Sequence, residues 1–275
     1  MIGSSSGTVL GTRVERLPDS PGPALLISDL HVPEDGGRAF DNLLAALAAA
    51  QRIGARLFVL GDLFDSYVAS AQMRVGIWRE VAAAMASAAA NGVAIDVLVG
   101  NRDFLLGPEF TTASRACLHH GGLRLALGGV ETLLLHGDEL CQNDLPYQRA
   151  KRWLRGSAVR FSARRLPLRL ALWVAARARR RSREVIAGGD QTRFLPTSSA
   201  LCEALSGGVE RVVFGHIHRH ATVAVGGRQA FVLPAFDSTP AGYLTAAAVI
   251  SAVRFDGGEG NPVEISVPML DLSGT

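Results

Sequence analysis

The chain has 275 residues, of which 48% are hydrophobic, and this is enough for one large α/β domain or two small ones. Its formal net charge is only +3, and 27 of its 28 basic residues are Arg, a bias that fits a GC-rich genome better than any function. No run of 18 or more apolar residues occurs, so we expect no membrane-spanning helix. The three cysteines, Cys117, Cys141 and Cys202, lack the spacing of a metal site and predict a reducing, cytoplasmic compartment.

Composition divides the chain into four segments. Residues 1–23 contain Ser, Gly and Pro without an apolar core, so we expect a flexible leader and not a signal peptide. Residues 24–268 carry the apolar runs of one domain, and residues 269–275 are expected to be a frayed tail. Within that domain, residues 144–195 form an insertion with a composition of its own.

The first half of the domain alternates between short apolar runs and helical patterns. Apolar runs at residues 24–28, 56–60 and 94–99 predict three strands, and the spacing at 38–52 and 72–90 predicts two helices. An order of strand, helix, strand, helix, strand is typical of a parallel sheet covered by helices.

Polar residues follow each of these three strands. Asp29 and His31 follow the first, Asp62 and Asp65 the second, and Gly100-Asn101-Arg102-Asp103 the third. A turn or a helix N-cap explains any one of these groups alone. Because ligands bind beyond the carboxyl ends of parallel strands, the three groups together predict one ligand site.

The second half adds two groups of histidine. Residues 123–127 and 131–135 predict a β-hairpin, which ends in His136-Gly137-Asp138. Residues 211–214 predict a strand that ends in Gly215-His216-Ile217-His218. The remaining predicted strands are residues 222–225, 229–233 and 245–255, with a turn at 257–261. We expect no functional role for the other histidines, which are His119, His120 and His220.

The candidate metal ligands are carboxylates, imidazoles and one amide, namely Asp29, His31, Asp62, Asn101, His136, His216 and His218. This set is too large for one tetrahedral zinc and suits two divalent ions that share a bridging carboxylate. Mixed nitrogen and oxygen ligands favour manganese, with iron or zinc as alternatives, over magnesium or calcium. Two ions about 3.5–4 Å apart would activate a shared water for in-line displacement at phosphorus and neutralise the phosphoryl oxygens.

Five motifs in this order, Asp-X-His, Gly-Asp-X-X-Asp, Gly-Asn-X-Asp, His-Gly-Asp and Gly-His-X-His, resemble the calcineurin-like metallophosphoesterases over residues 24–218. The resemblance implies an α/β (α+β) fold, a four-layer α-β-β-α sandwich. It also implies that one metal takes Asp29, His31, Asp62 and His218, and that the other takes Asp62, Asn101, His136 and His216. Asp65, Asp103 and Asp138 either orient these ligands or cap turns.

Within that superfamily, residues 100–107 and 136–141 are similar to the UDP-2,3-diacylglucosamine pyrophosphatases of lipid A synthesis. Many superfamily members carry His after the motif Asn, whereas this chain has Arg102, whose guanidinium can hold a diphosphate. The resemblance implies cleavage to UMP and 2,3-diacylglucosamine 1-phosphate. The implied catalytic residues are Asp62, Asn101, Arg102, His136 and His216. The implied substrate contacts are Asn101, Arg102, Asp144, Tyr147, Ser182 and His216.

The chain also departs from these pyrophosphatases. Ser66-Tyr67-Val68-Ala69-Ser70 stands where they have Trp and acidic residues, and Ile186 and Gly189 stand where they have Asn and Lys. A phosphoesterase acting on another substrate, such as a nucleotide phosphodiester or nucleic acid, is therefore the alternative. A non-catalytic interaction scaffold is a third hypothesis, disfavoured because scaffolds lose ligands and all seven positions are filled here.

The insertion is strongly basic. Residues 149–193 contain 14 of the 28 basic residues and only two acids, Glu184 and Asp190, interleaved with apolar residues. This pattern predicts amphipathic helices, either as a lid over acyl chains or at an anionic membrane surface, which places the protein peripherally at the inner membrane. A solvated helical hairpin is the alternative, and the apolar content disfavours a nucleic-acid surface.

Overall fold

The computed structural model describes residues 7–154, 191–255 and 262–272, together with the isolated positions 156, 170, 173 and 177. The predicted turn at 257–261 and most of the predicted helical insertion, including Ser182, Ile186 and Gly189, lie outside the described residues. Within the part of the chain that is described, no helix is long and apolar enough to cross a bilayer.

One seven-stranded sheet has the order β14-β13-β12-β3-β4-β5-β6. The parallel part contains the three strands predicted from the sequence and one more, namely β3 (Ala24–Ile27), β4 (Arg56–Leu60), β5 (Ile95–Leu98) and β6 (Cys117–His119). The antiparallel part is β12 (Ala241–Ala246), β13 (Val249–Arg254) and β14 (Val263–Glu264). The predicted parallel sheet is thereby confirmed.

The second seven-stranded sheet has the order β1-β2-β7-β8-β9-β11-β10. Its strands are β1 (Gly7–Val9), β2 (Thr12–Arg16), β7 (Gly122–Leu127), β8 (Val130–Leu135), β9 (Arg211–Phe214), β10 (Ala221–Val225) and β11 (Arg228–Val232). The predicted β7–β8 hairpin is confirmed, and β8 pairs in parallel with β9. Both histidine-bearing strands therefore end at the same edge of this sheet.

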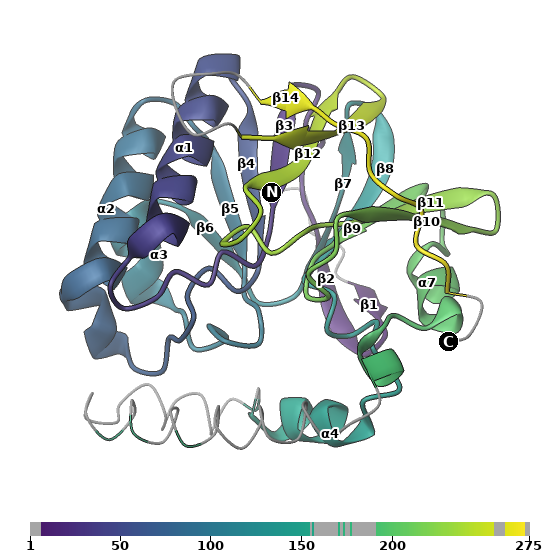
Figure 1. Cartoon of the computed structure of the whole chain (residues 1–275), viewed down its shortest axis with the longest axis horizontal. Coiled ribbons are helices and arrows are strands. Elements are labelled where there is room, and N and C mark those ends of the chain that lie inside the picture. The colour runs from purple at the N-terminus through teal and green to yellow at the C-terminus, as the bar shows by residue number, and fades with distance from the viewer. Residues whose placement is uncertain are drawn as a thin grey trace.

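Helices cover the outer face of each sheet, as Figure 1 shows. On one side lie α1 (Gly37–Ile53), α2 (Gly76–Ala90), which follows the 3-10 turn Ser70–Arg74, and α3 (Pro108–Ser114). On the other side lies α7 (Ser198–Ala204). The order helix, sheet, sheet, helix confirms the four-layer sandwich.

Successive side chains of each strand point to opposite faces of the sheet, and they fill the cores on its two sides. Leu25, Ile27 and Val59 face the layer of α1 and α2, whereas Leu26 and Phe58 face the second sheet. Every residue of β3 is buried because both of its faces are covered, as is usual in parallel sheets. The strand ends are therefore held rigidly, and the loops that follow them have fixed starting points.

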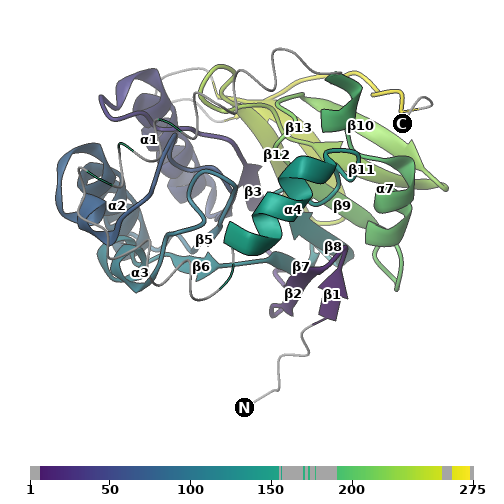
Figure 2. The same cartoon turned by 90° about the horizontal axis from the view of Figure 1, so that it is seen from below.

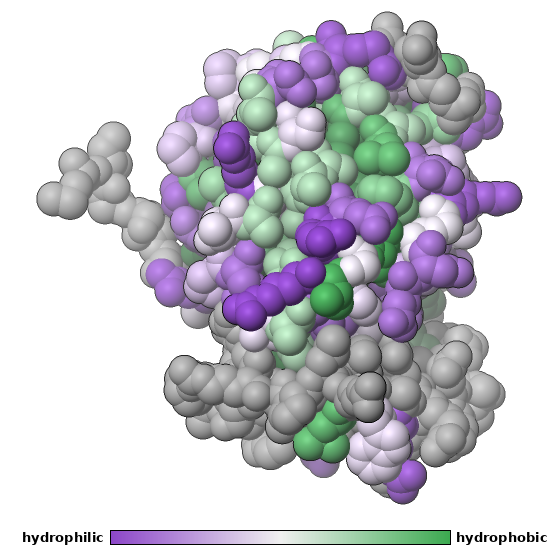
Figure 3. Space-filling view, turned by 90° about the vertical axis from the view of Figure 1, so that its left-hand side faces the viewer, coloured by the Kyte–Doolittle hydropathy of each residue, from purple (hydrophilic) through white to green (hydrophobic). Residues whose placement is uncertain are grey.

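The outer face of the helical layer carries a central band of hydrophobic residues, coloured light to dark green, among hydrophilic ones (Figure 3). Alanines are frequent in α1 and α2, and Leu44 and Val75 are larger apolar side chains that are exposed in this region of the chain. Single exposed apolar residues of this kind are ordinary on protein surfaces.

Three sequence predictions are wrong in detail. Residues 7–16 are not a flexible leader, because β1 and β2 pair with each other and β2 pairs with β7. The predicted strand 245–255 is a hairpin, since the chain turns at Ala247 with φ 51° between β12 and β13. Residues 269–272 are not frayed, because Met269 bridges to Thr222 and Leu272 is buried.

Of the predicted insertion at residues 144–195, the structure describes α4 (Leu145–Leu154) and a 3-10 turn at Gln191–Phe194. Figure 1 places α4 below the two sheets, and Figure 2, which views this end, shows α4 in front of them. The role of the insertion as a lid stays a prediction.

Candidate metal centre

Most of the candidate ligands sit on strained backbone. Asp29 (φ 55°), His31 (φ 45°), Asp62 (φ 51°), His216 (φ 68°) and His218 (φ 54°) are all left-handed. In the described part of the chain only three other non-glycine residues have positive φ. Such conformations cost free energy and persist where the surrounding structure enforces them, typically at functional sites. The turns after β3, β4 and β9 are thus shaped to direct these side chains to one place.

Two glycines allow the strand ends to approach closely. A Cβ at Gly100 would collide with the carboxylate of Asp62, and a Cβ at Gly61 (φ 96°) would collide with the ring of His136. Gly61 also needs a φ that side chains rarely adopt. The glycine that precedes the ligand in these motifs therefore creates room for a ligand from the neighbouring turn.

Asp62 lies between two imidazoles. Its Oδ2 is 3.4 Å from Nε2 of His31, and its Oδ1 is 3.8 Å from Nε2 of His136. The backbone N–H of Arg102 donates to Oδ1 at 2.9 Å. Burial alone would raise the pKa of Asp62, but the nearby His136 and His31 lower it well below its usual range. Each carboxylate oxygen faces a different histidine, which is the geometry that a bridging ligand needs.

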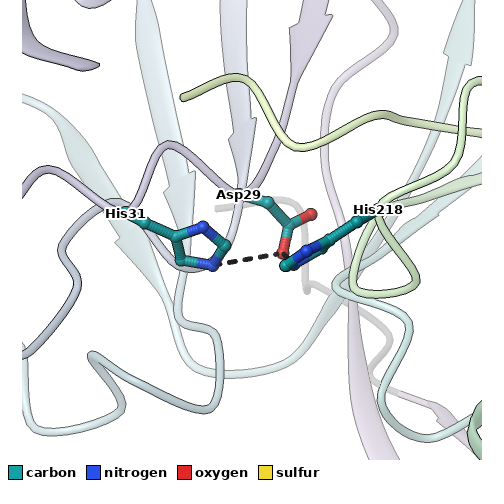
Figure 4. Close-up of side chains that lie close together, drawn as sticks. All are labelled: Asp29, His31 and His218. Carbon is teal, nitrogen blue, oxygen red and sulfur yellow. Dashed lines mark ion pairs between the residues drawn. The ribbon is translucent and has the colours of Figure 1, made fainter. Parts of the chain in front are cut away.

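Asp29 is buried and has an oxygen without a hydrogen bond. Its Oδ2 accepts from the backbone N–H of His216 at 2.8 Å. Its Oδ1 makes no hydrogen bond of acceptable geometry and lies 3.3 Å from Nε2 of His218 and 3.8 Å from Nε2 of His31. Figure 4 shows these three side chains converging. A buried, unpaired carboxylate oxygen among imidazole nitrogens fits a bound cation.

His136 is oriented by the main chain. Its Nδ1 lies 2.8 Å from the carbonyl oxygen of Leu60 and must carry the proton there. Its Nε2 then faces the Oδ1 of Asn101 at 3.0 Å. When His136 is neutral, both of these atoms are acceptors, so their closeness favours a proton or a cation between them.

His31 is oriented by a residue that the sequence motifs do not contain. Its Nδ1 lies 3.3 Å from Oδ2 of Asp237, in the loop after β11, and Asn42 donates to the carbonyl of Phe236 at 2.9 Å. Burial opposes protonation of His31, but hydrogen bonds to Asp237 and Asp62 outweigh it and raise its pKa to about 9. Asp237 is 206 positions from His31 and matches no motif, so no sequence signal identifies it.

The histidines form two pairs. His31 and His218 have ring centroids 4.9 Å apart, and His136 and His216 have ring centroids 5.1 Å apart. We call the first pair the outer half and the second pair, with Asn101, the inner half. Asp29 and Asp62 lie between the halves. Two groups of possible metal ligands follow from atom distances, Asp29 with His31 and His218, and Asp29 with Asp62 and His136.

All seven predicted metal ligands therefore meet at one place, and their donor set fits divalent cations. Burial and the neighbouring His136 lower the pKa of His216 to about 4, so its imidazole is neutral and ready to coordinate. The assignment of particular ligands to particular ions stays a prediction.

The three aspartates that follow the ligands have different roles. Asp103 is fully buried and accepts from the backbone N–H groups of Leu63 and Gly100, each at 2.7 Å, so it joins the turns after β4 and β5. Burial and the charge of Asp62 raise its pKa to about 7. Asp65 pairs with Arg102 at 2.5 Å, and Asp138 contacts α4.

The predicted substrate-contacting residues are only partly brought together. Arg102 lies at the metal centre, with Nε 3.5 Å from Oδ2 of Asp62 and about a third of its side chain exposed. The ring of Tyr147 lies 6.3 Å from that of His216. Asp144 precedes α4, and its Oδ1 accepts from the backbone N–H of Tyr147 at 3.4 Å, as an N-cap does. Ser182 lies outside the described residues.

The sandwich and its ligand turns define a metallophosphoesterase. Residues 22–220 match the family described as calcineurin-like phosphoesterase, and the chain belongs to that family. A relative from Edwardsiella ictaluri, named UDP-2,3-diacylglucosamine hydrolase, is 34% identical over 198 residues, or 72% of this chain and 76% of the relative. A protein of the same name from Azotobacter vinelandii is 34% identical over 212 residues, or 75% of this chain and 86% of that one.

Among solved structures, an archaeal phosphodiesterase is similar at 12% identity and a TM-score of 0.46, over 84% of this chain and 99% of that one. Family membership and hydrolase-named relatives make the protein a metal-dependent phosphoester hydrolase. The family uses a dinuclear divalent metal site, and the structure contains candidate ligand groups for it.

Proposed function

We propose that the protein hydrolyses the diphosphate bond of UDP-2,3-diacylglucosamine, giving UMP and 2,3-diacylglucosamine 1-phosphate. The observation that carries this proposal is Arg102. Its guanidinium lies beside Asp62 and is held by Asp65, yet about a third of the side chain remains exposed. It therefore presents a permanent positive charge at the edge of the metal centre, where a second phosphate would lie. The relatives named for this substrate support the same proposal.

The residues divide the work of the reaction. Asp29, His31, Asp62 and His218 would hold one divalent ion, and Asp62, Asn101, His136 and His216 the other. When bound, such ions supply positive charge for the phosphoryl oxygens and lower the pKa of a water. We propose manganese, with iron or zinc as alternatives, because the ligands mix imidazole and carboxylate.

Arg102 suits a diphosphate for a further reason. The leaving group from a diphosphate is itself a phosphate ester, which is far more acidic than an alcohol and departs without a general acid. The developing charge needs a cation instead, and a guanidinium keeps its charge at any working pH. A histidine at this position would titrate near neutral pH.

We also propose that the insertion at residues 144–195 covers acyl chains and that its basic residues hold the protein at the anionic, cytoplasmic face of the inner membrane. The support is its composition, 14 basic residues and two acids between positions 149 and 193. Deleting residues 155–190 should reduce sedimentation with anionic vesicles, while neutral vesicles serve as the control. Undiminished binding to anionic vesicles would place the membrane contact elsewhere.

The test of the substrate compares Arg102→Ala and Arg102→Lys with the wild type, all loaded with manganese. On UDP-2,3-diacylglucosamine, Arg102→Ala should lose about 100-fold in kcat/KM, and Arg102→Lys should lose less, because it keeps the charge without the planar fork. On a simple aryl phosphodiester, all three should agree within a few-fold. Bound manganese, measured by elemental analysis, should be unchanged.

Equal rates of Arg102→Ala and wild type on the diphosphate would show that Arg102 only pairs with Asp65. The proposed substrate would be wrong if the wild type does not hydrolyse UDP-2,3-diacylglucosamine but does hydrolyse a cyclic nucleotide or single-stranded DNA. The substrate would then be a phosphodiester.

A further inference from the structure

The only lysine of the chain is buried beside the metal centre. Lys151 stands alone among 27 arginines, and it is 9% exposed. Its Nζ lies 2.9 Å from Oδ1 of Asp138 and 3.7 Å from Oε2 of Glu139. Removing an ammonium group from water costs several kcal/mol unless it is paired, so this position is defined by its two carboxylates.

Those carboxylates belong to the turn that carries His136. Asp138 and Glu139 are buried and lie two and three residues after that ligand, at the end of β8. Lys151 comes from α4, the first element of the insertion. The ion pair therefore joins the insertion directly to a strand end of the metal centre.

Further polar contacts run between the same two segments. The hydroxyl of Tyr147 donates to Oδ2 of Asp138, and Nε2 of Gln148 donates to the carbonyl oxygens of Asp138, at 2.7 Å, and Cys141, at 3.2 Å. Residues 147 and 148 lie four and three positions before residue 151, so both side chains are its neighbours on one side of the helix. This contact also keeps the ring of Tyr147 beside His216.

Apolar packing contributes little to this docking in the described part of α4. Among the side chains described between residues 145 and 151, only that of Lys151 is buried, and Leu145 is 59% exposed. Between residues 145 and 151, the part of α4 whose side chains are described, no residue belongs to a core cluster. This first part of α4 is therefore held by charge and hydrogen bonds, and the directions of those bonds fix its position.

We propose that Lys151 is a positioning residue, which holds α4, and with it the start of the insertion, over the metal centre through Asp138 and Glu139. It fixes Tyr147 beside His216 and so sets how a substrate larger than a simple phosphodiester is held. The part concerning the large substrate rests on the proposed function. The part concerning the placement of α4 does not.

The experiment uses the full chain loaded with manganese and compares Lys151→Met with Lys151→Arg. Lys151→Met should raise amide hydrogen exchange in residues 145–154 by about tenfold or more and raise KM for UDP-2,3-diacylglucosamine by a similar factor. Its rate on an aryl phosphodiester and its bound manganese should stay within about twofold of wild type. Lys151→Arg restores a cation and should recover most of the protection and the KM.

Arg149→Met is the matched control for exchange, because it removes a cation from an exposed position of the same helix. Its exchange in residues 145–154 should equal that of wild type. If Lys151→Met does not fold, Lys151→Gln, which loses the charge but can still donate, is measured in its place and should show the same direction of change.

Unchanged exchange in the neutral variants would overturn the proposal. A parallel loss of manganese and of phosphodiester rate would also overturn it, because Lys151 would then act on the metal centre and not on α4. A wild type inactive on UDP-2,3-diacylglucosamine would refute the proposed substrate, whereas the exchange result would still decide the role of Lys151.

Discussion

The two halves of the metal centre are built in different ways. In the inner half, His136 is 3% exposed and its Nδ1 is fixed by the main-chain carbonyl of Leu60. In the outer half, His31 is fixed by the side chain of Asp237, which is itself 36% exposed, and the His218 side chain is 42% exposed. The orientation of His136 is thus set by a main-chain carbonyl of a strand, whereas that of His31 depends on a side chain from a loop. We expect the outer half to hold its ion less tightly.

The largest expected effect comes from Asp62, which serves both halves. Asp62→Ala removes the carboxylate between His31 and His136, so both halves should lose affinity for manganese. The rate on an aryl phosphodiester should fall by at least about a thousandfold, roughly 4 kcal/mol of barrier. Calorimetric titration with manganese and the hydrolysis rate measure this together. Undiminished turnover would refute a mechanism that uses two metals.

A smaller and one-sided effect is expected from Asp237. Asp237→Ala removes the group that orients His31 and should weaken manganese binding in the outer half by about 10- to 100-fold, with little change in the inner half. Asp237→Asn should lie between, because its carbonyl can still accept from Nδ1. Manganese titration should resolve one weakened and one unchanged site. Equal weakening of both sites would contradict the distinction between the halves.

The smallest expected effect is a control at a histidine that is not among the candidate ligands. His119 in β6 contacts Oδ1 of Asp96 at 2.9 Å and Oε2 of Glu15 at 3.1 Å, which joins the two sheets. Burial opposes protonation of His119, but hydrogen bonds to Asp96 and Glu15 raise its pKa above the usual value. Its contribution to stability is therefore full below the unfolded pKa of about 6.5 and is lost as pH rises through the folded pKa.

Accordingly, His119→Gln should lower the free energy of unfolding by about 1 kcal/mol at pH 6 and by less at pH 9, as urea unfolding at constant manganese would measure. The phosphodiester rate should not change. A rate that falls with stability would mean that losses in the other variants cannot be assigned to the metal centre.

The sequence predicts which polar side chains come together, because the candidate ligands follow the ends of the strands. At Gly61-Asp62 and Gly100-Asn101, the glycine that permits close approach stands directly before the ligand, so the local pattern carries the tertiary geometry. The helices α1 and α2 are likewise evident from the helical spacing of their apolar residues. The largely apolar strands that alternate with them indicate a sheet that is covered on both faces. Local signals suffice where one turn sets the direction of a side chain.

The rest was missed because its signals are not local. Asp237 contacts His31 across 206 positions of sequence, and only the folded chain brings them together. Lys151 likewise meets Asp138 only when α4 packs against the turn after β8. The hairpin of β12 and β13 turns at Ala247 without glycine or proline, so an apolar run hides it. Strands β1 and β2 are short and largely polar, and their order depends on the pairing of β1 with β2 and of β2 with β7.

The left-handed backbone conformation is unfavourable for residues with a side chain, yet five candidate ligands adopt it, namely Asp29, His31, Asp62, His216 and His218. Glycine adopts this conformation freely, whereas other residues pay roughly 1 kcal/mol or more there. Replacing a ligand by glycine would therefore relax the backbone at the moment it destroyed the site. The five side chains are thus held at a local cost in backbone free energy, which their position at the metal centre explains.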